Sequence, residues 1–161
     1  MDLSLIAETV LIGILTGGVY ALMASGLTLI FGVMEIINIG QGAFVILGAY
    51  LSFALVQHAH IDPFVGLLIT MPLMFGLGVL IELAFIRPLK RDRTRLSILV
   101  TFGIALVIEG VLGIEFGTNI VKIQAWYVTD SINVGGFYVA YIYVFGLILA
   151  VALLSGLYLL L

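Results

Sequence analysis

Long apolar runs separated by short polar segments make up almost the whole chain. The first extends from about Leu3 to Phe31, and four more cover about residues 42–56, 64–86, 96–116 and 139–161. A helix needs about 20 predominantly apolar residues to cross a bilayer, so the pattern predicts about five membrane-spanning helices, the second of them short. A helix as long as the first run would measure about 43 Å, so we expect it to tilt, to project beyond the hydrocarbon core, or to break near Gly26.

Polar residues and glycines interrupt this pattern between the first two runs. The polar residues are Glu35, Asn38 and Gln41, and the glycines are Gly26, Gly32, Gly40, Gly42 and Gly48. Polar side chains in hydrocarbon usually face a bundle interior or a water-filled path, and clustered glycines permit close packing or a broken helix. We therefore predict a broken polar segment near residues 32–42. A transporter's substrate site is often built this way, but a packing helix whose amides bond to neighbouring helices would give the same pattern.

Small residues and prolines mark further features of the apolar runs. Gly13 and Gly17 form a pair at four-residue spacing, which is typical of a helix-packing face. Pro63 is expected in the first turn of the third helix. Pro72 is expected to kink that helix near its middle.

Composition extends the membrane interpretation to the whole chain. Of its 161 residues 63% are hydrophobic and only 9% are charged, which predicts an all-α, polytopic transmembrane helical bundle. The chain has no cysteine, so we expect neither a disulfide nor a thiolate metal site. Its six basic residues form no surface large enough to bind nucleic acid.

Five of the six basic residues lie in one short segment, RPLKRDRTR; they are Arg87, Lys90, Arg91, Arg93 and Arg95. A short loop this basic stays on the cytoplasmic side of the membrane, and it could also contact anionic lipid or a cytosolic partner. The fourth helix would then run outward. The connection around Trp126 would be periplasmic, and the fifth helix would return to the cytoplasmic face.

Few side chains suggest chemistry. Glu109, inside the fourth run, is either a protonated packing residue or part of a polar path. His58, His60 and Asp62 have metal-ligand chemistry, but no fourth ligand accompanies them and an interfacial loop explains them better. No phosphate-binding loop or catalytic set is present in the sequence, so we expect no enzyme activity and no cofactor.

The connection from Thr118 to Phe137 has features of a membrane interface. Trp126 and Tyr127 fit an interfacial aromatic belt. Gly135 and Gly136 lie between two β-prone flanks, which predicts a small hairpin.

Two blocks of this sequence closely resemble the permeases of bacterial branched-chain amino acid ABC transporters. The first is GVYALMASGLTLIFGVMEIINIGQGAFVILGAY, in which Asn38, Gln41, Gly42 and Gly48-Ala49-Tyr50 match the family pattern. The second is RPL followed by TFGIALVIEG, in which Thr101, Gly103 and Glu109 match. Glu35 departs from the glycine or other small residue that the family pattern leads us to expect.

The resemblance implies one subunit of a multispanning inner-membrane importer. Such permeases are about twice as long, so residues 1–161 are expected to form a single permease domain truncated at its C-terminus. The implied partners are cytosolic ATPase subunits, a second permease subunit, a periplasmic substrate-binding protein, membrane lipid and a small amino acid substrate. The resemblance leaves urea or short amides open as substrates. A passive channel and a helical scaffold remain the alternative classes.

Combined with this resemblance, the polar residues suggest a substrate path. Asn38 and Gln41 would line or brace it at the break between the first two helices, and Thr101 and Glu109 would come from the fourth. The permease itself would do no chemistry; ATP hydrolysis elsewhere would bias which of its two ends is open.

Overall fold

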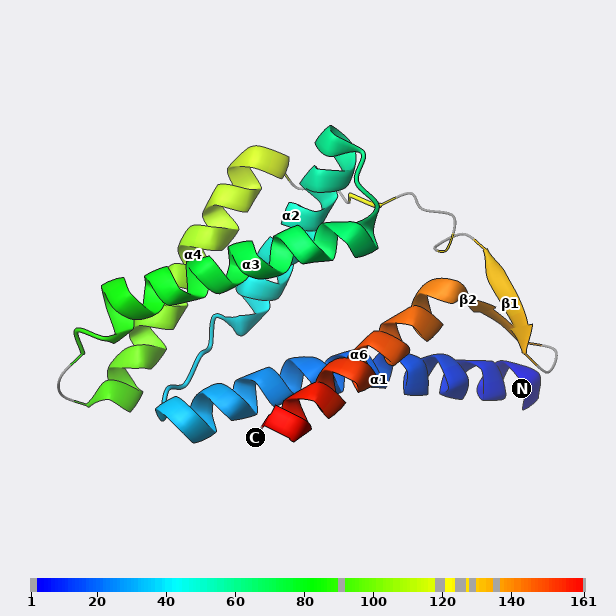
Figure 1. Ribbon diagram of the computed structural model, residues 1–161, viewed down its shortest axis with the longest axis horizontal. Coiled ribbons are helices and arrows are strands. Elements are labelled where there is room, and N and C mark those ends of the chain that lie inside the picture. Colours follow the sequence, from blue (N-terminus) through cyan, green and yellow to red (C-terminus); the bar gives the residue numbers. More distant parts are fainter. Residues whose placement is uncertain are drawn as a thin grey trace. The chain divides into compact units, whose positions relative to one another are not determined.

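The computed structural model describes residues 3–89, 92–117, 121–123, 127, 130–134 and 137–160. The elements are α1 (Leu3–Met34), α2 (Gln41–Ala59), α3 (Pro63–Ile81), the π-helical turn η1 (Glu82–Ile86), α4 (Arg93–Phe116), β1 (Ser131–Val134), β2 (Phe137–Ala140) and α6 (Tyr141–Leu160) (Figure 1). Within the described residues, five helical segments are long and apolar enough to cross a membrane. The predicted helical, polytopic fold is confirmed.

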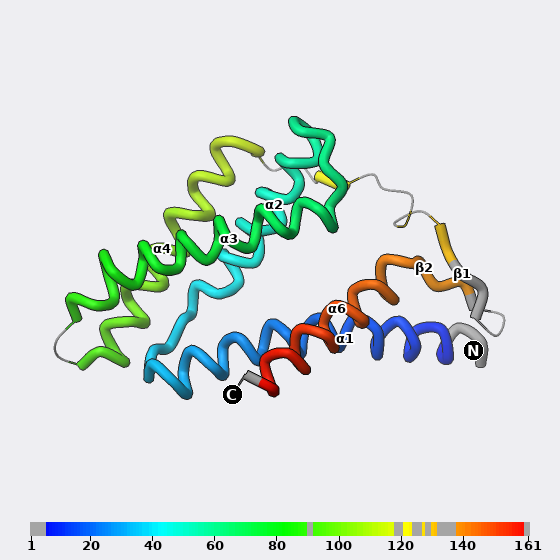
Figure 2. The backbone as a smooth tube through the Cα atoms, in the orientation of Figure 1, coloured from blue at the N-terminus to red at the C-terminus, as the bar shows by residue number. Residues whose placement is uncertain are grey.

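The first helix is longer than the sequence predicted and does not break at Gly26. It remains α-helical from Leu3 to Met34, and the amide of Glu35 makes the last helical bond, to the carbonyl of Phe31 at 3.0 Å. Glu35 has a φ of 55°, and this left-handed conformation terminates the helix. The predicted break near residues 32–42 is confirmed, because the chain re-enters a helix only at Gln41 (Figure 2).

The chain divides into two compact units, Met1–Thr28 with Gln124–Leu161, and Leu29–Ile123. In the first unit α1 and α6 approach closely at glycines. A methyl group added to Gly18 would collide with the side chain of Leu147, and one added to Gly146 would lie 3.3 Å from Val19. Gly13 and Gly17, by contrast, have no described atom outside their own helix within 4 Å of an added Cβ. Among the described residues, therefore, the glycine of α1 that packs closely against α6 is Gly18.

The first unit also contains the predicted hairpin. β1 and β2 are antiparallel, with Val134 opposite Phe137 and Ser131 opposite Ala140. This register leaves Gly135 and Gly136 to join the strands, and both lie outside the described residues, as does Trp126. Tyr127, expected in an interfacial belt, is buried within the chain at 3% exposure, with its ring 6.2 Å from that of Phe145.

In the second unit α2 packs against both α3 and α4. The rings of Tyr50 on α2 and Phe116 on α4 lie 4.4 Å apart. The hydroxyls of Ser52 on α2 and Thr70 on α3 are 3.4 Å apart, and a Cβ on Gly66 would lie 3.7 Å from Leu55. Small and hydroxylated residues thus allow close contact between these helices, as is usual in membranes.

The turns that join these helices explain several sequence features. Asp62 accepts a hydrogen bond from the amide of Phe64 at 2.9 Å, and Pro63 occupies the first turn of α3 as predicted. His60 ends α2 with a φ of 51°. Two of the three residues considered as metal ligands, His60 and Asp62, therefore occupy helix-end positions. The helix α3 remains α-helical through Pro72.

The end of the third span contains a feature that the sequence did not predict. Residues Glu82–Ile86 form a π-helical turn, in which the amide of Arg87 donates to the carbonyl of Glu82 at 2.7 Å. A salt bridge of 2.8 Å then joins the Glu82 carboxylate to the Arg93 guanidinium at the start of α4. The third span and α4 are thereby linked at their basic end.

Candidate functional site

The candidate site is the non-helical segment Glu35–Gly40, which joins α1 to α2 and lies along the first turns of α4. A break in a membrane helix leaves backbone amides and carbonyls without helical partners, and each must be satisfied by another group. Here three hydroxyl side chains on one face of α4 supply those partners. They are Thr94, Ser97 and Thr101, at helical spacings of three and four.

The three hydroxyls form hydrogen bonds with the backbone of alternate residues of the segment. Thr94 Oγ1 donates to the Glu35 carbonyl at 2.9 Å, and Ser97 Oγ accepts from the Ile37 amide at 3.3 Å. Thr101 Oγ1 accepts a hydrogen bond from the Ile39 amide at 3.2 Å.

Thr101 also lies within reach of two carbonyl acceptors. Its Oγ1 is 3.4 Å from the Ile37 carbonyl and 3.3 Å from that of Ile98 in its own helix. One hydroxyl therefore contacts both a backbone amide and a backbone carbonyl of the broken segment. We call the set of Thr94, Ser97 and Thr101 the hydroxyl ladder.

The segment is held in a tightly packed environment. Ser97 is fully buried and Thr101 is 4% exposed, and Ile36 in the segment and Ala43 at the start of α2 are buried as well. Gly40 completes the contact: a Cβ added there would lie 2.7 Å from the Thr101 carbonyl oxygen and 3.5 Å from Ala105. Since the obstacle is backbone, only glycine fits at this position without a shift.

Asn38 and Gln41 differ from the residues that the ladder supports. Asn38 belongs to the non-helical segment, and Gln41 begins α2. The side-chain oxygens of both are enclosed by protein. Among the described residues Asn38 Oδ1 has no hydrogen-bond donor, which is costly for a buried acceptor. This oxygen could accept a hydrogen bond from an ammonium or amide group of a ligand.

The structure brings some of the predicted site residues together and not others. Thr101 contacts the segment that carries Asn38 and Gln41. Glu109, two turns further along α4, is exposed in this chain and makes no hydrogen bond or ion pair with another described residue. Gly32, Gly42 and Gly48 have no described atom outside their own helices within 4 Å of an added Cβ.

Two basic residues, Arg93 and Arg95, lie at the start of α4 next to the ladder, and Arg87 follows η1. Arg87 and Arg95 are exposed, and Arg93 pairs with Glu82. Lys90 and Arg91 lie outside the described residues.

Ser97 and Thr94 were not among the predicted site residues. Their signal was nevertheless in the sequence, because TRLSILVT places hydroxyls at positions 94, 97 and 101 of an otherwise apolar run. That spacing puts them on one helix face.

Comparison with known proteins gives a consistent result. The family described as "Branched-chain amino acid transport system / permease component" matches residues 9–161. The probable branched-chain amino acid transport permease protein LivH of Methanocaldococcus jannaschii is 30% identical over 156 residues, which cover 92% of this chain and 48% of that protein.

More distant relatives carry a similar description. The high-affinity branched-chain amino acid transport system permease proteins LivH of Salmonella typhimurium and Escherichia coli are each 24% identical over 137 residues, covering 75% of this chain and 44% of theirs. The chain thus spans about half the length of these curated relatives. No solved structure matches it.

Proposed function

Since this chain belongs to the family of branched-chain amino acid transport permease components, we propose that it forms part of the membrane path of an ATP-driven importer for branched-chain or related amino acids. The path would open alternately to the two sides of the inner membrane. The permease would not change its substrate chemically.

The observation that carries this proposal is the broken segment Glu35–Gly40 with its enclosed acceptor. The backbone of the segment finds partners in the hydroxyl ladder, whereas Asn38 Oδ1 finds none among the described residues. A scaffold would gain nothing from an unsatisfied buried amide. In a transporter the same oxygen is available to a substrate that carries N–H donors.

We assign roles to the candidate residues on this basis. Asn38 and Gln41 contact the substrate or brace the path, and Thr101 positions the segment that carries them. Glu109 lies on the same helix, and in the assembled transporter it would contribute a polar group further along the path.

The proposed partners follow from the family. They are cytosolic ATPase subunits, a second permease subunit and a periplasmic substrate-binding protein. ATP hydrolysis would shift the equilibrium between the two open states only if the ATPase subunits contact those states differently. A passive channel would require none of these partners, so co-purification of an ATPase subunit with this permease separates the two classes.

The test is uptake of radiolabelled leucine by cells that carry Asn38→Leu or Gln41→Leu, each divided by the amount of folded protein in the membrane. Side-chain hydrogen bonds in membranes average about 0.6 kcal/mol, so abundance should fall little. We expect uptake per folded protein to fall at least about tenfold, which corresponds to about 1.4 kcal/mol of lost interaction.

Thr101 provides the matched control. Thr101→Ser keeps the hydroxyl that accepts from the Ile39 amide and should retain uptake. Thr101→Val leaves that amide without its acceptor, which costs about 1–3 kcal/mol, and should lower the amount of folded protein. If uptake merely follows abundance in the Asn38 and Gln41 variants, these residues are structural and the path lies elsewhere.

A further inference from the structure

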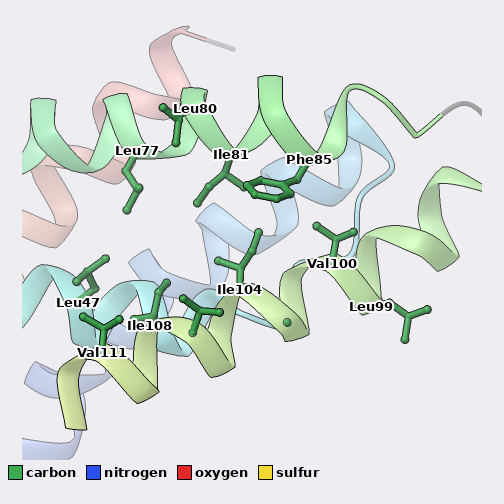
Figure 3. A pocket seen from close by; sticks show the side chains of 12 residues that line it. Leu47, Leu77, Leu80, Ile81, Phe85, Leu99, Val100, Ile104, Ile108 and Val111 are labelled. Atoms are coloured by element: carbon green, nitrogen blue, oxygen red, sulfur yellow. The ribbon is translucent and has the colours of Figure 1, made fainter. Parts of the chain in front are cut away.

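A second feature of the Leu29–Ile123 unit is an apolar groove between the third span and α4, to which α2 contributes Leu47. Its volume is about 650 Å³, within the range of about 300–1,000 Å³ for pockets that hold small organic ligands. Every residue that lines it is apolar or a glycine. Figure 3 shows Leu77, Ile81 and Phe85 directed from the third span toward Ile104 of α4.

The length of the groove limits what can occupy it. On α4 its lining extends from Leu99 to Val111, twelve helical steps or about 18 Å. The hydrocarbon core of a bilayer is about 30 Å thick, so the groove is about one leaflet deep. A transmembrane helix would need a groove nearly twice as long, whereas a single acyl chain needs only this length.

Charge is concentrated at one end of the groove. Arg95 lies one turn before Leu99, at the start of the row Leu99, Gly103 and Val107 that lines the groove. Arg87 follows the lining residue Phe85 by two positions. Both arginines are exposed, and neither has an ion-pair partner among the described residues, whereas Arg93 is engaged by Glu82.

We propose that this groove binds one acyl chain of an anionic phospholipid, with the phosphate of its headgroup at Arg95 and Arg87. The apolar lining accommodates the chain, and the two free guanidiniums can form charge-assisted hydrogen bonds to the phosphate. Cytoplasmic leaflets are rich in anionic lipid, and the basic segment is expected on that side. The bound lipid would fill the space between the two helices that the Glu82–Arg93 pair joins at one end.

Native mass spectrometry of the full-length protein tests this. The protein is extracted from vesicles of equal parts phosphatidylglycerol and phosphatidylcholine, and the lipids that remain bound are counted. An arginine near an anionic surface contributes about a fivefold affinity gain. We expect phosphatidylglycerol to be retained about fivefold or more over phosphatidylcholine, and Arg95→Gln to lower that preference about fivefold. Arg95→Lys should keep most of it.

Matched variants separate the two parts of the site. Lys122→Gln removes the sixth basic residue, which lies beyond the far end of α4, and should leave the preference unchanged. Gly103 lines the groove, and a Cβ added there meets no described atom outside its helix. The side chain of Gly103→Leu therefore fits into the groove and should lower retention of both lipids. Gly113→Leu makes the same change on α4 outside the groove and should have no effect.

Three results would overturn the proposal. Equal retention of the two lipids in the unmodified protein would mean that the arginines bind no headgroup. Unchanged retention in Gly103→Leu would place the lipid elsewhere. Absence of bound lipid together with self-association that Gly103→Leu abolishes would show that a helix of a second copy occupies the groove.

Discussion

Glu35 ends α1 in a backbone conformation that disfavours any residue with a side chain. Its φ is 55°, and the left-handed region costs such a residue about 1–2 kcal/mol. Its carboxylate also lies at the carboxyl end of a long helix, where the helix dipole is unfavourable to negative charge. The family pattern leads us to expect a glycine or other small residue here, and the structure gives a physical reason: the position is a helix C-cap.

Glu35→Gly should therefore stabilise the protein, by about 1 kcal/mol after the greater chain entropy of glycine is subtracted. Reversible unfolding in mixed micelles with increasing dodecyl sulfate measures this change. Val33→Gly, an exposed position within α1, is the control and should destabilise the protein by about 0.4 kcal/mol, the difference in helix propensity between valine and glycine. If Glu35→Gly lowers the free energy of unfolding as much as Val33→Gly does, the Glu35 carboxylate makes stabilising interactions that outweigh the backbone strain.

At the scale of elements, the broken segment depends on close approach to α4. The hydroxyl ladder provides hydrogen bonds along the segment, and Gly40 lets its last residue lie directly on the backbone of α4 near Thr101. Such contact requires both a small residue on one side and hydroxyls on the other. Because each alone is common in membrane helices, their combination at matched positions specifies how the segment docks.

Gly40→Ala tests this docking against Gly42→Ala. The added Cβ at Gly40 would lie 2.7 Å from a backbone oxygen, while the one at Gly42 meets no described atom outside its own helix. Overpacking of this kind costs about 1–3 kcal/mol, so Gly40→Ala should lower unfolding stability and uptake together. Gly42→Ala, inside α2, should be neutral or stabilising. Equal stability of the two variants would mean that the segment is not pressed onto α4.

Much of the architecture could be predicted from the sequence, because long apolar runs define membrane helices directly. The break at residues 35–40 could also be predicted, since glycines and polar residues cluster there. Its docking on α4 could not, because the spacing of Thr94, Ser97 and Thr101 places them on one helix face but does not say which segment that face contacts. The π-helical turn has no distinctive composition. Gly17 and Gly18 have similar neighbours in sequence, and only the packing against Leu147 distinguishes them.

At the scale of the whole molecule, charge sets the orientation of the helices. The described arginines Arg87, Arg93 and Arg95 lie at the end of the third span and the start of α4. Thr94, in the same turn, bonds to Glu35, so the broken segment lies at this basic end of α4. If the positive residues are cytoplasmic, the segment lies in the cytoplasmic half of the membrane and would form part of the inner end of the path.

This orientation predicts which positions are accessible from the periplasm. The chain contains no cysteine, so single cysteines can be introduced without removing native ones. In intact cells a membrane-impermeant maleimide should label Lys122→Cys and Asp130→Cys, which follow α4 and are exposed, and it should spare Arg95→Cys. Glu8→Cys should also be labelled if α1 crosses the membrane once. Permeabilised cells provide the control, because Arg95→Cys must then react. Labelling of Arg95→Cys alone in intact cells would reverse the orientation and move the broken segment to the outer end of the path.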